Sequence, residues 1–118
     1  MIRVVSLVRL TDEGARGIDA FADTVAKVRE TVTENGGALE YAWQTAGIYD
    51  FVAVLNFPDL ESEFRSRNEV YKMGTIRVDH VPAIPLDEAL KLHESAFSHQ
   101  GHDIAESETE KDISDAFE

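Results

Sequence analysis

The segment from Trp43 to Asp59 constrains the fold more than any other part of the chain, because two apolar runs flank a short Gly-Ile-Tyr-Asp turn at 47–50. This pattern is typical of a β-hairpin, and the Pro58-Asp59 pair after it is typical of the start of a helix. The run after the turn alternates between Phe51, Ala53, Leu55 and Phe57 on one face and Val52 and Val54 on the other. Both faces of this strand are apolar, which indicates a sheet covered on both sides.

Apolar periodicity places the other elements around this hairpin. Helical spacing predicts one long helix from residue 18 to Gly36-Gly37 and a second from Pro58-Asp59 to Gly74. Strands are expected at 1–10, 38–45, 51–57 and 75–81, and a short third helix at 87–96. The order β-α-β-β-α-β is the split βαβ, ferredoxin-like arrangement, so the expected fold class is α+β.

Alternation within the strand at 38–45 predicts which residues share a face. It puts Leu39, Tyr41 and Trp43 on one face and Glu40, Ala42 and Gln44 on the other. We expect Tyr41 and Trp43 to lie in the core rather than to form an aromatic ligand cage. In the second helix, one side carries Leu60, Phe64, Arg67 and Tyr71.

The two-sided apolar pattern also predicts an assembly. Helices of a ferredoxin-like unit cover one face of the sheet, and one short C-terminal helix cannot cover the other. A second copy stacked sheet to sheet could, so we expect a homodimer or an assembly of dimers. We expect one domain at 1–96 and an acidic, mobile tail at 97–118, because the tail has few apolar anchors.

Composition excludes several classes of site and partner. The absence of cysteine excludes disulfides, zinc–thiolate sites and thiol nucleophiles. A net charge of −12 repels nucleic acid, and no apolar run can span a bilayer, so we expect a cytoplasmic protein without nucleic-acid or membrane partners. The shortage of lysine beside many carboxylates favours a salt-adapted host over an acidic tail on an ordinary domain.

An ordered set of short motifs resembles the GYD-domain family, whose members have the dimeric α+β barrel fold. The motifs, over residues 2–94, are Leu10-Thr11-Asp12-Glu13-Gly14, Gly36-Gly37, Trp43-Gln44-Thr45-Ala46-Gly47-Ile48-Tyr49-Asp50, Pro58-Asp59, Gly74-Thr75-Ile76-Arg77 and Asp87-Glu88. The hairpin motif also resembles the effector-binding module of feast/famine regulators. The resemblance implies the barrel fold and the dimer, but no particular activity. The chain departs from the family at Val78 and His80, where the family usually has threonines.

Gly47, Tyr49 and Asp50 at the hairpin turn are candidate ligand-binding residues, with Asp50 placed to accept hydrogen bonds from an amine or amide. Turn chemistry explains the same residues more simply: glycine supplies a positive φ, Asp50 caps turn amides and Tyr49 packs its ring. Arg77 and Asp79 share a face of the last strand. They could hold a small ligand in the space between two sheets, or form an ion pair.

His80 is the candidate for catalysis, because it is a titratable group close to Arg77 and Asp79. Its alternation with Ile76 and Val78 favours a buried, hydrogen-bonded histidine instead. The sequence shows no nucleophile or second base beside it, so we assign no catalytic residue. The loose cluster of His93, His99 and His102-Asp103 fits no standard metal motif, so we expect neither a metal nor a cofactor.

Two functions fit these observations. The first is a non-catalytic dimeric module that binds a small metabolite or regulates a partner. The second is a cofactor-free small-molecule enzyme of the isomerase or monooxygenase type. An enzyme needs an internal cavity of roughly a few hundred cubic ångströms with convergent polar groups, whereas a packing module fills that space with side chains.

Overall fold

The computed structural model describes residues 1–98. Its elements are β1 (Ile2–Leu10), α1 (Asp12–Arg16), a 3₁₀ turn (Ile18–Ala20), α2 (Phe21–Glu34), β2 (Ala38–Gln44), β3 (Phe51–Phe57), α3 (Leu60–Lys72), β4 (Ile76–Pro82) and α4 (Leu86–Ser98). The chain divides into two compact units, residues 1–83 and 84–118. The predicted mobile tail lies, from residue 99 onward, outside the described residues.

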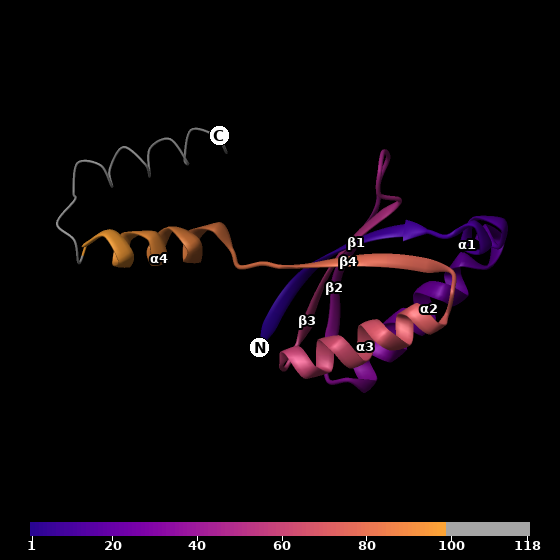
Figure 1. Ribbon diagram of the computed structural model, residues 1–118, viewed down its shortest axis with the longest axis horizontal. Helices are drawn as coiled ribbons and strands as arrows, with labels where there is room; N and C mark the ends of the chain where they lie inside the picture. Colours follow the sequence, from indigo (N-terminus) through magenta and orange to yellow (C-terminus); the bar gives the residue numbers. More distant parts are fainter. Residues whose placement is uncertain (99–118) are drawn as a thin grey trace. The chain divides into compact units, whose positions relative to one another are not determined.

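The first unit is built on a four-stranded sheet. Its strand order is β2-β3-β1-β4, and every neighbouring pair is antiparallel. The helices α2 and α3 lie on one side of the sheet (Figure 1). This is the ferredoxin-like α+β fold that the order of elements predicted.

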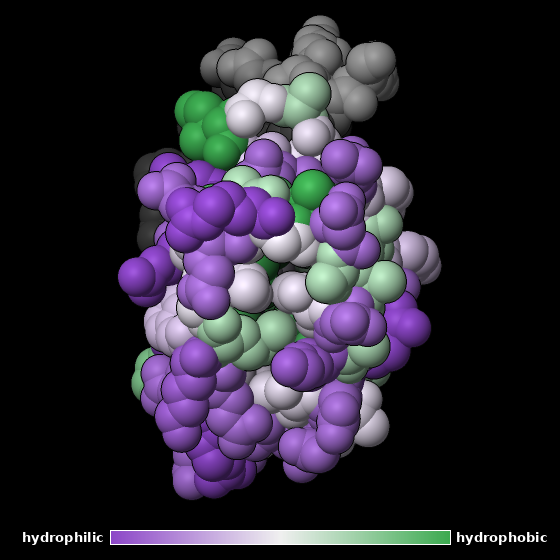
Figure 2. All heavy atoms as spheres, turned by 90° about the vertical axis from the view of Figure 1, so that its right-hand side faces the viewer, coloured by the Kyte–Doolittle hydropathy of each residue, from purple (hydrophilic) through white to green (hydrophobic). Residues whose placement is uncertain are grey.

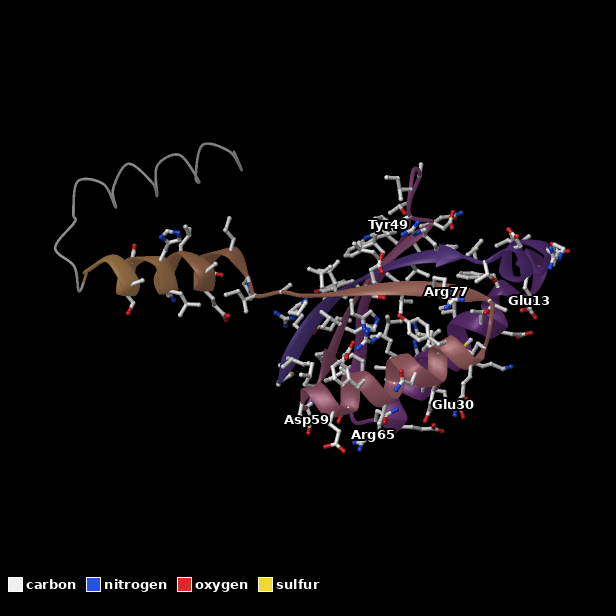
Figure 3. The ribbon with its side chains drawn as sticks, viewed as in Figure 1. Glu13, Glu30, Tyr49, Asp59, Arg65 and Arg77 are labelled. Atoms are coloured by element: carbon white, nitrogen blue, oxygen red, sulfur yellow. The ribbon has the colours of Figure 1, made fainter. Side chains whose placement is uncertain are left out.

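Local signals in the sequence fix the ends of the helices. The Asp59 carboxylate accepts a hydrogen bond from the Ser62 amide at 2.8 Å. Hydrogen bonding from the side chain of Ser62, and then from its amide, lowers the pKa of Asp59. Asp59 is labelled at the start of α3 in Figure 3. The Thr11 hydroxyl caps α1 through the Gly14 amide at 3.0 Å. At the far end of α2, Gly36 turns the chain with a φ of +78°, which favours glycine.

The core lies between the sheet and the helices, in two clusters. One contains Val4, Leu55 and Phe57 from the sheet and Val32 from α2. The other contains Val8, Ile76 and Val78 from the sheet and Val70 from α3. Each helix therefore anchors one half of the sheet by a valine near its C-terminal end.

The opposite side of the sheet is the open face, on which Val5, Leu7, Val52 and Val54 form an apolar centre. These four residues are half-buried, while Val4, Val8 and Leu55 on the helix side are buried. No element of residues 1–83 covers the open face. The sheet is thus apolar on both sides, as the sequence pattern predicted. The molecular face toward the α1 end is, by contrast, mostly hydrophilic (Figure 2).

A β-bulge in β2 corrects the predicted faces of that strand. Leu39 pairs with Leu55, but Tyr41 pairs with Val54, so Glu40 is an extra residue in the register. Leu39 and Ala42 therefore face the helices, whereas Tyr41 and Trp43 face the open side. The prediction that Tyr41 and Trp43 lie in the core was wrong for this chain, because the inserted residue reverses the alternation after it. The two rings stack at 5.7 Å and are 60% and 53% exposed.

Helix α3 turns its polar side toward the sheet. Ser62, Glu63 and Ser66 are buried, whereas Leu60 and Phe64 from the apolar side are exposed. The buried Glu63 carboxylate lies 2.7 Å from the His80 ring of β4, so a polar contact joins this side of the helix to the sheet.

The second unit contains α4 in its described part, with Asp87 and Glu88 in the first turn of the helix. The predicted short helix at 87–96 is present and is one residue longer at its start and two at its end. Among residues 1–98, no helix has the length and apolar content needed to cross a membrane.

Candidate functional site

One end of the open face carries a cluster of polar side chains, the turn-end cluster, made of Arg9, Tyr49, Arg77 and Asp79. Arg9 and Arg77 stand directly opposite each other on β1 and β4. The Asp79 carboxylate lies 3.7 Å from the Arg9 guanidinium and accepts a long hydrogen bond of 3.5 Å from the Tyr49 hydroxyl. The Arg9 guanidinium also lies 5.3 Å from the centre of the Tyr49 ring. Tyr49 and Arg77 are labelled in Figure 3.

The cluster is accessible and carries an excess of positive charge. The side chains of Arg9 and Asp79 are 52% and 57% exposed. Arg77 is exposed as well, and its guanidinium lies 5.9 Å from the centre of the Tyr71 ring. By register Arg77 shares this end of the sheet with Arg9 and Asp79, while its guanidinium lies toward Tyr71 of α3. Two arginines therefore stand at one end of the sheet in a chain whose net charge is −12, and guanidinium groups bind anionic groups well.

The other candidate residues of the turn hold the hairpin against β1. Asp50 accepts the Leu10 amide on its carboxylate at 2.8 Å and donates its own amide to the Val8 carbonyl at 2.9 Å. Gly47 has a φ of +115°, a conformation that favours glycine. The Thr45 hydroxyl donates to the Tyr49 carbonyl at 2.7 Å. The positive φ of Gly47 matches the turn chemistry expected of glycine, whereas the Asp50 carboxylate bonds an amide of β1 and not an amide of the turn. The side chain of Tyr49 belongs to the turn-end cluster.

A second polar group closes the opposite end of the open face. The Glu40 carboxylate accepts hydrogen bonds from Arg3 at 3.2 Å and Asn56 at 2.8 Å. The Asn56 hydrogen bond, with help from Arg3, lowers the pKa of Glu40. The apolar centre of the open face is therefore framed by polar groups at both ends.

His80 is buried and hydrogen-bonded, as its place on an apolar face predicted. Its Nδ1 atom lies 2.7 Å from Glu63 Oε1, and the two side chains are 7% and 4% exposed. The Nε atom of Arg67 lies 3.1 Å from the same oxygen without hydrogen-bond geometry, so that contact is ionic. Arg67 also donates from Nη2 to Glu63 Oε2 at 3.5 Å.

Burial lowers the pKa of His80 below its ordinary value of 6.5, although the hydrogen bond to Glu63 and the negative charge of Glu63 act in the opposite direction. The positive charge of Arg67 adds to the lowering. Burial therefore favours the neutral ring, whose Nδ1–H tautomer can donate to the Glu63 carboxylate, with Arg67 beside the same carboxylate. The group joins α3 to the sheet.

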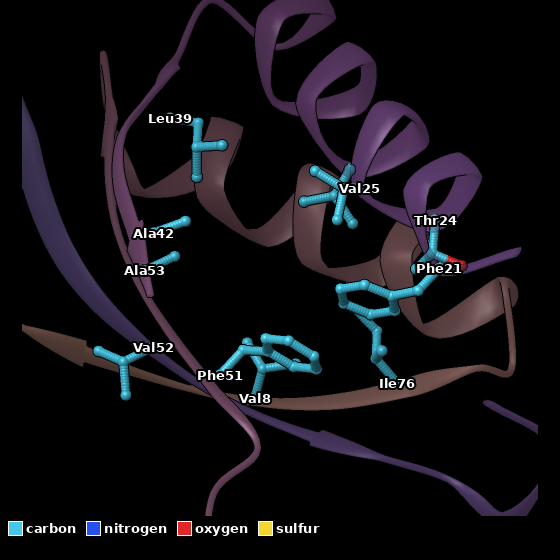
Figure 4. Close-up of a pocket in the computed structure, with 11 residues that line it drawn as sticks. Val8, Phe21, Thr24, Val25, Leu39, Ala42, Phe51, Val52, Ala53 and Ile76 are labelled. Atoms are coloured by element: carbon cyan, nitrogen blue, oxygen red, sulfur yellow. The ribbon is translucent and has the colours of Figure 1, made fainter. Parts of the chain in front are cut away.

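The small cavities within residues 1–83 include two between the sheet and the helices. One of about 50 Å³ is lined by Ser6, Ser66 and His80 together with core valines and leucines. The other, of about 90 Å³, is apolar and lies below α2 (Figure 4). Neither reaches the roughly 300 Å³ at which small-molecule pockets usually begin.

Three residues of these groups were missed from the sequence. Arg9 is paired with Arg77 by the antiparallel register of β1 and β4. The pattern of apolar residues within one strand does not predict which residues of another strand lie opposite it. Glu63 was not singled out, and Arg67 was grouped with Leu60, Phe64 and Tyr71 on one side of the helix. Within residues 1–98, no group of three metal-ligating side chains comes together. His99 and His102 lie outside the described residues.

Comparisons with known proteins agree with this geometry. The crystal structure of FFRP-DM1, a feast/famine regulatory protein, has a similar fold, with a TM-score of 0.51 and 17% sequence identity. The similarity covers 71% of this chain and all of that one. No curated protein matches the sequence. The GYD domain family matches residues 4–92, most of the chain. The hairpin with its Gly-Ile-Tyr-Asp turn lies within the matched residues. The chain therefore belongs to the GYD domain family.

Proposed function

We propose that this chain is a non-catalytic module that pairs with a second copy through its open face and binds a small anionic metabolite at the turn-end cluster. The observation that carries the proposal is the cross-strand pairing of Arg9 with Arg77. Like charges directly opposite each other on a sheet destabilise it. The Arg77 guanidinium lies beside Tyr71 of α3. A carboxylate or phosphate that draws it toward Arg9 would offset that cost and gain charge-assisted hydrogen bonds from both guanidinium groups.

The neighbouring side chains support the same assignment. Tyr49 supplies a hydroxyl and an aromatic surface, and Asp79 can accept a hydrogen bond from a second polar group of the ligand. Gly47 and Asp50 hold the turn that positions Tyr49.

A matched pair of probes tests the site. Succinate and its uncharged diamide, succinamide, differ in charge but little in shape. We expect succinate to raise the melting temperature and succinamide to leave it unchanged, because only the carboxylates can bridge the guanidinium groups. Arg77→Gln should abolish the succinate effect.

The control variant is Arg29→Gln. It removes an exposed arginine of α2, a helix on the side of the sheet opposite the turn-end cluster. It should respond to succinate as the parent protein does. An equal response of the Arg77→Gln and Arg29→Gln variants, or a response to succinamide as large as that to succinate, would contradict the proposed site.

A further inference from the structure

We infer that the apolar cavity below α2 is a second binding site, for an uncharged molecule about the size of one aromatic ring. The cavity has a volume of about 90 Å³ and lies on the helix side of the sheet. It is separate from the turn-end cluster on the opposite side, so the inference does not depend on the proposed function. Its lining includes Phe21 and Thr24 of α2 and Leu39, Ala42, Phe51 and Ala53 of the sheet.

The cavity exists because two small residues lie side by side on neighbouring strands. Ala42 of β2 pairs directly with Ala53 of β3, and both lie on the helix side. The next pair on that side is Leu39 with Leu55, whose larger side chains fill the layer. Two methyl groups below α2 leave a hollow that two leucines would close.

The shape of the hollow is suited to a ring. Phe21 and Phe51 stack with their centroids 4.3 Å apart and form one wall. A ring beside this pair can make the offset or edge contacts that aromatic groups prefer. Ala42 is exposed at the edge strand, so the hollow opens to solvent and a ligand can enter without unfolding.

The chemistry of the lining decides which ligand fits. Thr24 is the one polar side chain among the lining residues, and its oxygen points away from the centre of the cavity (Figure 4). A charged or strongly polar group would lose its hydration there without gaining a partner. Apolar cavities of about 150 Å³ hold benzene, so this smaller, open one would hold a ring in part, its outer edge at Ala42.

Benzene is the probe and benzoate its charged control, each titrated into ¹⁵N-labelled protein and followed by NMR. We expect saturable shifts at the amides of Ala42 and Ala53, with a Kd of about 1 mM or tighter. Benzoate should leave these amides unmoved, because its carboxylate has no partner in the cavity. Shifts that grow linearly with benzene concentration, or that benzoate reproduces, would overturn the inference.

Variants that fill the hollow separate a site from a surface effect. Ala53→Leu should weaken benzene binding at least tenfold, whereas Ala22→Leu, the same change at an exposed position of α2, should leave it intact. Ala42→Val adds a smaller volume at the exposed edge of the cavity and leaves the interior packing unchanged. It should also weaken benzene binding. Equal benzene affinity in Ala42→Val and Ala22→Leu would place the ligand elsewhere and overturn the inference.

Discussion

At the scale of single residues, Asp50 shows how a turn residue stabilises a neighbouring strand. Its carboxylate reaches the Leu10 amide at the end of β1, a contact between residues forty positions apart. The carboxylate therefore contributes to tertiary structure as well as to the hairpin. The sequence predicted that Asp50 would cap turn amides, but the strand that supplies the amide became known only with the sheet order.

Replacing Asp50 tests this contribution. We expect Asp50→Ala to lower the free energy of unfolding by about 1–2 kcal/mol, because the Leu10 amide loses a charge-assisted hydrogen bond. Asp50→Asn, which keeps a carbonyl oxygen in the same place, should lose less. Urea unfolding of the three proteins measures the difference. An unchanged unfolding midpoint in Asp50→Ala would mean that the bond adds nothing to stability.

At the scale of elements, the contact between α3 and the sheet depends on the protonation of His80. The pKa of His80 is lowered in the folded protein, so the unfolded chain binds more protons as the pH falls below about 6.5. Stability is therefore complete above about pH 6.5 and decreases on acidification. The lowered pKa values of Asp59 and Glu40 act at lower pH, near and below their ordinary values of 3.8 and 4.5.

The window between pH 5 and pH 7 thus isolates His80. We expect the free energy of unfolding to fall across this window in the parent protein. The loss should be smaller in His80→Gln, whose amide can donate to Glu63 without titrating. Arg29→Gln, a change at an exposed position of α2 that does not titrate in this window, is the control and should behave as the parent. A parent protein that gains stability on acidification would show that His80 is charged when folded.

The same elements show where sequence patterns succeed and fail. Strand and helix positions followed from periodicity, and Thr11, Asp59 and Gly36 marked helix ends through local chemistry. The sequence did not predict which side chains of β2 after Glu40 face the helices. The β-bulge inserts one residue into the strand, and no residue type in the sequence marks its position. The orientation of α3 also escaped, because its inward side is chosen by a charged residue that meets His80 across the fold.

At the scale of the whole molecule, the open face has consequences for assembly. Four half-buried aliphatic residues and two exposed aromatic rings lie together on one side of the sheet. An apolar surface of this kind is typical of an interface. We propose that two copies cover it mutually, as the resemblance to dimeric α+β barrels also implies.

Val54 provides the test, since it lies in the middle of the open face opposite Val5 and Tyr41. We expect the parent protein to have the mass of a dimer or of a multiple of it in light scattering. Val54→Lys should shift it toward the monomer, because a buried charge without a partner is costly. Ala26→Lys on the exposed side of α2 adds the same charge elsewhere and should not change the mass. A monomeric parent at micromolar concentration would refute the pairing.

The bulge at Glu40 also gives the protein an internal optical reporter. Trp43 is the sole tryptophan, and the reversed alternation after Glu40 places its ring on the open face, where it is 53% exposed. Indole emission moves to shorter wavelength when water around the ring is replaced by apolar groups. The fluorescence spectrum of the unlabelled protein therefore indicates whether that face is covered. Dilution could follow its uncovering at concentrations far below those that light scattering requires.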